Sequence, residues 1–232
     1  MVAMKVSVII PAYNEQEYIG RCLASLQRQD VPADEIIVVD NNCTDATADI
    51  AACFEVLVVR EYKQGLIEAR NKGFQVATSD ILARCDADTI VRTDWIKRIK
   101  KTFTNKHIEA LSGPCYFYDA PFLNGNSTWN HWVYFRVAKL ITGYNVLFGS
   151  NMAIRRQTWL EIKHEMCIND SVVHEDLDLG LHIQRHRSIK YDRSLTAGIS
   201  ARRMLHQPFS FFIEYPTRWV RTLYTHRHLL RK

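Results

Sequence analysis

Apolar residues follow two alternating spacings along the first hundred positions. Short continuous apolar runs, typical of strands buried in a sheet, are each followed by a stretch whose apolar residues recur every three or four positions, as on one face of a helix. The predicted strands cover residues 5–10, 35–40, 55–60 and 80–86, and the predicted helices cover 14–29, 44–54, 66–78 and 94–103. Asn14, three residues before Glu17, is the expected start of the first helix. Strict alternation of strand and helix predicts an α/β fold with a mostly parallel sheet flanked by helices.

The alternation loosens after residue 105. The pattern there predicts a strand over 108–119, a helix over 129–141, a short strand over 150–156 and a helix over 174–186. The segment from 201 to the end contains seven Lys or Arg residues and one acid, with aromatic residues interleaved. We expect a main domain over 1–205 and a basic aromatic helical appendage over 206–232.

Polar residues gather directly after three of the predicted strands. "PAYNE" follows the first strand, "DNNCTD" ends the second and "DAD" ends the fourth. Ligand sites of parallel α/β sheets lie outside the carboxyl ends of the strands. We therefore expect Glu15, Asp40, Asp86 and Asp88 to meet at one edge of the sheet.

Composition and charge limit the class of protein without deciding its function. With 232 residues, 47% of them hydrophobic, and a net charge of +5, the chain has a globular composition and permits an anionic partner such as a nucleotide or a phospholipid surface. Its six cysteines form no C-x-x-C pair, which indicates a reducing compartment without a disulfide framework. Since the apolar start is too short for a signal peptide and no apolar run reaches the length of a membrane span, we expect a cytoplasmic protein.

The acid pair Asp86 and Asp88 fits several interpretations. Asp commonly caps the helix that follows a turn. A calcium loop is excluded because Ile90 and Val91 stand where further loop residues of that site are needed. Carboxylates also suit Mg²⁺ or Mn²⁺ bridging to a leaving diphosphate. The letters "DADT" further match haloacid-dehalogenase-type phosphatases, with Asp86 as nucleophile, although that motif normally opens its domain.

A second acidic cluster lies near residue 175. Glu175, Asp176 and Asp178 either begin a solvated helix or supply a carboxylate general base. Glu175 or Asp176 is placed for this role if the helix points at the carboxyl edge of the sheet. Arg70 either reaches a diphosphate or forms a surface salt bridge.

Six segments together resemble the inverting family 2 glycosyltransferases of the GT-A fold. They are "VSVIIPAYNE", "IIVVDNNCTDAT", "ARNKG", "ARCDADT", "GSNMAIRR" and "HEDLDLGLHI", and their order and spacing agree over about residues 5–205. The resemblance implies a GT-A fold and a hexosyltransferase that moves a single sugar from a nucleotide-diphosphate sugar to an acceptor hydroxyl. It also implies Mn²⁺ or Mg²⁺ as cofactor.

The resemblance further implies which residues perform this reaction. Asp176 would be the catalytic base, and Asp88 would bind the metal. The implied nucleotide-sugar-binding residues are Pro11, Ala12, Tyr13, Glu15, Asp40, Arg70, Asp86, Ala87, Gly149, Ser150, Asn151 and Glu175. Tyr13 would stack on the base, and Asp40, as an acceptor for a ring N–H, favours uracil and hence UDP.

Two features concern the acceptor and the tail. The Q-x-x-R-W of processive members appears here as "YPTRW", which favours single-sugar transfer. The stretch "SARRM" is similar to a variant in small bacterial members, so Arg202 or Arg203 would help bind phosphate and His206 would complete the metal shell. The C-terminal appendage, residues 206–232, would either pack on its own domain or lie on the cytoplasmic face of an anionic membrane. A membrane location suits a lipid-linked acceptor, and glycan and small-molecule acceptors are the alternatives.

Two other classes of function remain as alternatives. A nucleotidyltransferase shares the α/β plan and the metal, but no glycine-rich phosphate loop followed by Lys lies near the first strand. A non-catalytic module would use the tail to bind RNA or membrane with strongly salt-dependent affinity. The acids at three strand ends argue against nucleic acid in the main cleft.

Overall fold

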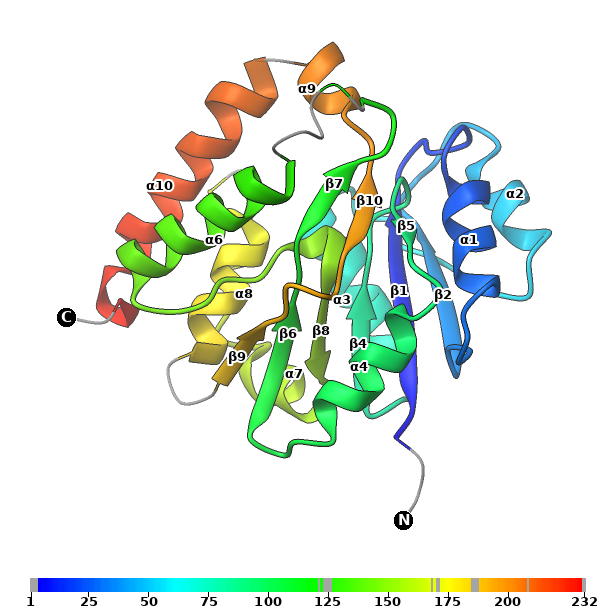
Figure 1. Ribbon diagram of the computed structural model, residues 1–232. Coiled ribbons are helices and arrows are strands. Elements are labelled where there is room, and N and C mark those ends of the chain that lie inside the picture. The colour runs from blue at the N-terminus through cyan, green and yellow to red at the C-terminus, as the bar shows by residue number, and fades with distance from the viewer. Residues whose placement is uncertain are drawn as a thin grey trace.

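The computed structural model describes residues 4–120, 122, 127–167, 169, 172–184, 188–207 and 209–230, with the backbone alone described for 127–133 and 211. A seven-stranded sheet forms the centre, with helices on both faces (Figure 1). Its strands are β1 (Val6–Ala12), β2 (Glu35–Asp40), β3 (Leu57–Arg60), β4 (Ile81–Arg84), β6 (Ile108–Ser112), β8 (Met152–Arg155) and β9 (Ser188–Tyr191). The helices against it are α1 (Ile19–Gln27), α2 (Thr47–Ala52), α3 (Leu66–Val76), α4 (Trp95–Phe103), α7 (Arg156–Ile162) and α8 (Glu175–Gln184). The predicted α/β fold is confirmed.

The strand order explains how the site is assembled. Strands lie in the order β3-β2-β1-β4-β8-β6-β9, and only β8 runs against its neighbours within this described sheet. Met152, the first residue of β8, therefore pairs with Arg84 and Ser112 at the carboxyl ends of β4 and β6. This reversal delivers the 3₁₀ turn η1 (Gly149–Asn151), which precedes β8, to the same edge as the loops of the parallel strands.

A small second sheet lies beside the main one. It consists of β5 (Ile90–Val91), β10 (Ala197–Ile199) and β7 (Cys115–Phe117). The strand predicted over 108–119 is thus two strands, interrupted at Gly113 and Pro114. Pro114 has no N–H for a ladder, and a Cβ at Gly113 would lie 2.0 Å from the carbonyl oxygen of Leu195, so the backbone passes too close for any other residue.

Alternate residues of the central strands pack on opposite faces of the sheet. Val8 and Ile10 of β1 belong to an apolar cluster with residues of α1 and α4, whereas Ile9 belongs to a separate cluster with residues of α3, α7 and α8. Both faces are covered, so a continuous apolar run such as "VSVII" is the expected strand sequence.

The first helix starts later than predicted. Asn14 has a φ of 54° and lies in a turn, where its Oδ1 accepts a hydrogen bond from the Thr44 N–H at 2.8 Å. The helix begins only at Ile19. The capping prediction was wrong because Asn14 uses its side chain to join two loops, and residues 13–18 remain available at the sheet edge.

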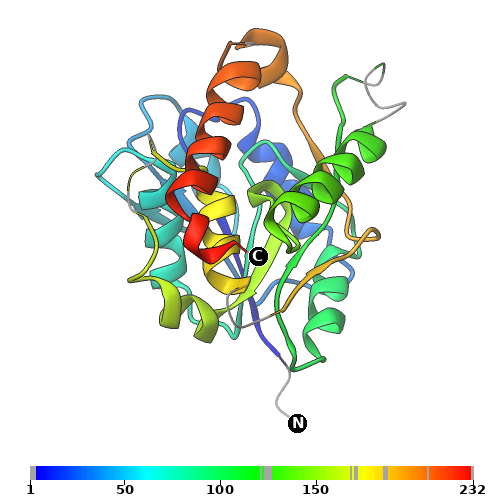
Figure 2. The same cartoon turned by 90° about the vertical axis from the view of Figure 1, so that its left-hand side faces the viewer.

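The C-terminal segment folds back over the main sheet layer. It contains α9 (Arg202–His206), the π-helical turn η2 (Ser210–Glu214), α10 (Tyr215–Thr225) and the 3₁₀ turn η3 (Arg227–Leu229). Figure 2 shows α10 alongside α8, and Leu229 packs with Leu177 and Leu181 of α8 and with Phe135 of α6 (Ser127–Thr142). No helix among the described residues is long and apolar enough to cross a membrane.

Candidate active site

Loops from separate strands meet at the carboxyl edge of the sheet. The loop after β1 is joined to the loop after β2 by the Asn14–Thr44 hydrogen bond. The Cys22 thiol of α1 lies 3.6 Å from the carbonyl oxygen of Asp86, which follows β4. The structure therefore brings together the polar strand ends that the apolar pattern placed at one edge.

Two arginines neutralise the acid pair Asp86 and Asp88. Arg84 Nη2 lies 3.1 Å from Asp86 Oδ1, and Ser150 Oγ donates to Asp86 Oδ2 at 2.5 Å. Arg202 Nε donates to Asp88 Oδ2 at 3.2 Å. Each acid contacts a different arginine, and this arrangement reduces the repulsion between two carboxylates separated by one residue.

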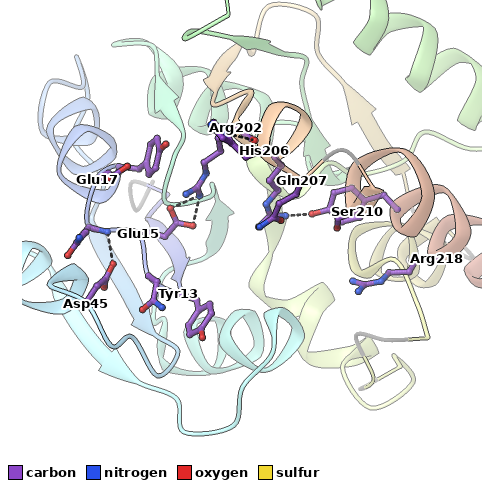
Figure 3. A pocket seen from close by; sticks show the side chains of 14 residues that line it. Tyr13, Glu15, Glu17, Asp45, Arg202, His206, Gln207, Ser210 and Arg218 are labelled. Atoms are coloured by element: carbon purple, nitrogen blue, oxygen red, sulfur yellow. Dashed lines mark hydrogen bonds and ion pairs between the residues drawn. The ribbon is translucent and has the colours of Figure 1, made fainter.

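Arg202 of α9 crosses the opening of the site. Its Nη2 donates to both carboxylate oxygens of Glu15 at 2.5 Å (Figure 3). Its guanidinium lies 4.1 Å from the ring centroid of Tyr18. Burial and the negative charge of Asp86 raise the pKa of Asp88 to about 6 despite Arg202. Burial likewise raises the pKa of Glu15. Arg202 therefore compensates only part of the negative charge at this edge.

An open cleft of about 720 Å³ lies beside Arg202, a volume typical of small-molecule sites. Its walls include Tyr13, Glu15, Asp45, Arg202, Arg203 and Arg218 (Figure 3). The C-terminal segment supplies the arginines, and the loops after β1 and β2 supply the acids and the accessible ring of Tyr13. Arginines on one wall suit an anionic phosphate, and carboxylates on the other suit hydroxyl groups.

A second cluster of charges lies at the start of α8. Glu175 accepts a hydrogen bond from Arg70 Nη1 at 2.5 Å and one from Arg84 Nη1 at 2.6 Å, each on a different carboxylate oxygen. Asp176 Oδ1 lies 3.1 Å from the same Arg84 nitrogen, and Asp176 Oδ2 accepts from the Gly149 N–H at 2.7 Å. Both acids and both arginines are buried.

The two acids of this cluster differ in their affinity for a proton. Burial raises the pKa of Glu175, but Arg84 and Arg70 outweigh burial and bring the pKa well below its usual range. Burial and the neighbouring Glu175 raise the pKa of Asp176 well above its usual range. Glu175 therefore stays ionised with both oxygens bound, and Asp176 is the acid suited to exchange a proton.

Gly149 makes the contact with Asp176 possible. A Cβ at this position would lie 2.6 Å from Asp176 Oδ1 and 2.7 Å from the Arg84 guanidinium carbon. Such distances are too short for a side chain, so the backbone N–H can approach the carboxylate only because residue 149 is glycine.

The order of these features along the chain can be compared with known families. A family model described as Glycosyl transferase family 2 matches residues 7–161. The chain belongs to glycosyltransferase family 2. This membership confirms the predicted resemblance and decides against the phosphatase alternative, in which Asp86 would have been the nucleophile.

Curated relatives of this family 2 glycosyltransferase from different organisms are also described as glycosyltransferases. Glycosyltransferase AglE of Haloferax volcanii is 34% identical over 116 residues, which are 47% of this chain and 38% of that protein. Putative glycosyltransferase EpsH of Bacillus subtilis is 33% identical over 102 residues, 42% of this chain and 30% of that protein. The chain therefore spans well under half the length of these two relatives.

Solved structures of glycosyltransferases share the fold. The mannosyltransferase PcManGT of Pyrobaculum calidifontis, in complex with GDP-Man and Mn²⁺, superposes with a TM-score of 0.78 at 19% identity, over 98% of this chain and 65% of that one. Glucosyl-3-phosphoglycerate synthase of Mycobacterium tuberculosis, in complex with Mn²⁺, UDP and glucosyl-3-phosphoglycerate, gives a TM-score of 0.63 at 18% identity, over 84% and 72%. The family 2 enzyme described here therefore has a GT-A fold.

The acid pair fits the divalent cation that the family implies. Asp86, Asp88 and Glu15 are oxygen donors close together, and the charge that Arg202 leaves uncompensated is negative. Oxygen donors of this kind suit Mn²⁺ or Mg²⁺. His206, at the end of α9, is exposed and its Nδ1 lies 3.0 Å from the Arg202 carbonyl oxygen, so its place in a metal shell stays a prediction.

The predicted donor residues of this family 2 enzyme occupy the strand ends. Pro11 and Ala12 are the last two residues of β1 and, like Ala87, are buried. Asp40 ends β2, and its Oδ1 accepts a hydrogen bond from the Cys43 N–H at 2.8 Å. These positions bring the residues to the edge that carries the cleft, and their contacts with a donor stay predictions.

Two of the predicted donor residues are enclosed by the protein. Arg70 is fully buried against Glu175, which argues against the surface salt bridge considered from the sequence. Asn151 is also fully buried, and its amide joins the indole N–H of Trp95 at 2.8 Å to the carbonyl oxygen of Leu195 at 2.6 Å. Both residues position neighbouring elements in the structure described here. Of the predicted donor residues, Tyr13 and Glu15 line the cleft, and the others, Asp40 and Asp86 included, do not.

Arg84 is the functional residue that the sequence patterns missed. It contacts Asp86, Glu175 and Asp176 and is 1% exposed. A signal was present, because "DILARCD" places an arginine inside an apolar strand, where an unpaired charge would be very costly. A buried partner set of acids was therefore to be expected.

Proposed function

We propose that this family 2 glycosyltransferase transfers a single sugar from a nucleotide-diphosphate sugar to an acceptor hydroxyl, with inversion and with help from Mn²⁺ or Mg²⁺. One observation carries the proposal: the Arg84 guanidinium contacts both Asp176 and Asp86, at 3.1 Å each. A proton acceptor and an acid of the donor site thus lie on either side of one rigid side chain. The spacing of Asp176 and Asp86 across Arg84 suits an acceptor hydroxyl held next to the sugar of a bound donor.

The donor would occupy the cleft beside Arg202. The base would stack on Tyr13, Asp40 would accept from its ring N–H, and Glu15 would accept from a ribose hydroxyl. Asp88, assisted by Asp86, would hold the cation, which when bound neutralises charge on the leaving nucleoside diphosphate. GDP-Man and UDP in the related structures support the donor class, and the acceptor role of Asp40 favours UDP.

Asp176 would act as the general base. Its carboxylate takes the proton of the acceptor hydroxyl while the hydroxyl oxygen forms a bond to the anomeric carbon and the bond to the diphosphate oxygen breaks on the opposite face, which inverts the configuration. The Arg84 guanidinium and the Gly149 N–H hold Asp176 in its orientation. Because Asp176 is buried, water has little access to compete with the acceptor.

The acceptor side is best tested at the C-terminal segment. Phe209, Ile213, Val220 and Tyr224 are exposed there among basic residues, and such a surface suits an anionic membrane and a lipid-linked acceptor. We expect the protein to sediment with phosphatidylglycerol vesicles and Val220→Asp to weaken this binding. Leu57→Asp, an exposed position on β3, is the matched control. Equal binding by both variants would place the acceptor contact elsewhere.

The deciding experiment is thermal melting with UDP, GDP, dTDP and CDP, each with and without Mn²⁺. A nucleotide at a hundred times its Kd stabilises the protein by about 2.7 kcal/mol. We expect one nucleotide to raise the melting temperature in a Mn²⁺-dependent manner. Asp88→Ala should lose this shift, and Asp176→Asn should retain it because the base is not needed for donor binding. No shift with any nucleotide would overturn the proposal.

A further inference from the structure

A cluster of metal-ligating side chains lies outside the sugar-transfer site, between α8 and the end of α10. Asp178 and His182 are one turn apart on α8, and His226 directly follows α10. The Asp178 Oδ1 lies 3.0 Å from His226 Nε2 and 3.5 Å from His182 Nδ1. Asp178 is 1% exposed. We refer to Asp178, His182 and His226 as the His–Asp cluster.

The hydrogen bonds of the imidazole rings determine which nitrogens carry hydrogen. His226 Nδ1 lies 3.0 Å from the Thr222 carbonyl oxygen, and His182 Nδ1 lies 2.9 Å from the Asp178 carbonyl oxygen. A carbonyl can only accept, so both Nδ1 atoms carry hydrogen. In the neutral ring of His226 the lone pair is then on Nε2, which faces a carboxylate oxygen.

A lone pair and a carboxylate oxygen 3.0 Å apart repel each other unless a positive charge lies between them. Within the described part of the chain, Asp178 Oδ1 also has no aligned hydrogen-bond donor. The other oxygen of this carboxylate accepts from the Cys167 N–H at 3.1 Å. One buried carboxylate oxygen therefore lies next to two imidazoles, and its negative charge requires a cation at this point, either a proton on His226 or a metal ion.

We propose that the His–Asp cluster binds a divalent transition metal ion, of the Zn²⁺ class. Imidazole nitrogen and carboxylate oxygen are zinc ligands, and one ring nitrogen of each histidine and one Asp178 carboxylate oxygen all lie within 4.8 Å of one another. Because its Nδ1–H is bonded to the Asp178 carbonyl oxygen, His182 would bind the ion through Nε2. In zinc sites the second ring N–H of a histidine ligand usually donates to a backbone carbonyl or a carboxylate, and His226 Nδ1–H makes such a bond to the Thr222 carbonyl oxygen. The mixed nitrogen and oxygen donors distinguish this site from the all-oxygen set at Asp86 and Asp88.

The position of the cluster indicates what the ion would do. It would tie the C-terminal segment to α8, the helix that begins with Glu175 and Asp176. Other contacts already join these elements: the His174 N–H donates to Thr222 Oγ1 at 2.7 Å, and Leu229 packs on Leu177 and Leu181. The ion would thus serve stability and the placement of α8, without contacting the sugar donor. This proposal stands independently of the proposed transfer reaction.

Cobalt substitution tests the site directly. The full-length protein, freed of metal by a chelator and dialysed, is titrated with Co²⁺, whose visible absorption is strong in four-coordinate nitrogen and oxygen sites. We expect one Co²⁺ per chain with this absorption, its displacement by Zn²⁺, and a higher melting temperature with Zn²⁺ than without metal. His226→Gln and His182→Gln should each lose the absorption and at least tenfold in affinity.

Two controls separate this site from others. Asp88→Asn should keep the Co²⁺ absorption, since it alters only the acid pair, and His107→Gln, an exposed histidine, should keep it as well. Circular dichroism shows which of the two ligand variants remains folded, and either one suffices. No Co²⁺ absorption in the wild type, or equal absorption in the ligand variants, would overturn the proposal. In that case a proton on His226 Nε2, and not a metal ion, lies between this nitrogen and Asp178 Oδ1, since Asp178 raises the pKa of His226.

Discussion

The two acid pairs of this enzyme are neutralised in different ways. Asp86 and Asp88 follow β4 at the sheet edge, with side chains 37% and 12% exposed, and Asp88 is paired with Arg202, which lines the cleft and is 22% exposed. Glu175 and Asp176 lie under the surface and share Arg84, which is 1% exposed. We call them the open pair and the buried pair.

The difference indicates which ion pairs must stay formed and which can separate to admit a ligand. A buried carboxylate left without its arginine costs several kcal/mol, so the buried pair must keep its partners throughout the reaction cycle. Arg202 is more exposed than Arg84, so its ion pair with Asp88 costs less to separate when a metal ion or a diphosphate arrives. The buried pair is therefore preorganised, and the open pair is where ligands exchange.

Removing the proposed base should have the largest effect. Asp176→Asn keeps the size of the side chain but cannot accept the proton, and general bases contribute typically 10²–10⁴-fold. We expect kcat to fall by about that factor, as measured by steady-state release of the nucleoside diphosphate. The Kd for the nucleotide, from calorimetry, should change little. A variant with the kcat of the wild type would remove Asp176 from the mechanism.

Removing Arg84, the arginine shared by the buried pair, should have the second largest effect, in this case on stability. Arg84→Met leaves Glu175 and Asp176 buried without one of their cations, which we expect to lower the free energy of unfolding by about 3–5 kcal/mol in urea titration. Arg98→Met, which breaks an exposed ion pair with Asp94, should lower it by less than about 1 kcal/mol. Similar losses in the two variants would contradict the distinction between fixed and exchangeable charges.

Neutralising Glu175 should move the pH dependence of activity. As the proposed general base, Asp176 would have to be deprotonated, so we expect kcat/KM to fall as the pH drops through its pKa, which Glu175 helps to raise. Glu175→Gln removes that negative charge and leaves Arg84 and Arg70 positive, so the pKa of Asp176 falls. The acidic limb of the pH–rate profile should therefore shift to lower pH. Glu161→Gln, on the exposed side of α7, should leave the limb unchanged.

Removing Arg202 should have the smallest effect on stability. We expect Arg202→Ala to change the free energy of unfolding by about 0–1 kcal/mol, because the ion pairs with Glu15 and Asp88 are partly exposed. At pH 8, where Asp88 with a pKa of about 6 is ionised, Mn²⁺ alone should bind more tightly to this variant, since a competing cation is gone. Weaker Mn²⁺ binding would show that Arg202 supports the metal site instead.

The strand and helix segments of the first hundred residues could be predicted because their signal is local. Burial on both faces of the sheet gives continuous apolar runs, and β2 was predicted with its observed bounds, 35–40. Asn14 was misjudged since its partner, Thr44, lies 30 residues away. Arg84 was missed for the same reason: the acids that make its burial possible lie 91 and 92 residues further along the chain.

The reversed strand β8 has a consequence for protein engineering. Because β8 enters the sheet at its catalytic edge, the chain between Phe117 of β7 and Gly149 is anchored in sheet structure at both ends. Much of that insert, including Phe135 and Ala138 of α6, packs into a third apolar cluster separate from the two that cover the main sheet. The same cluster contains Leu177 and Leu181 of α8, so a segment taken from a relative would have to preserve this packing to keep Asp176 in place.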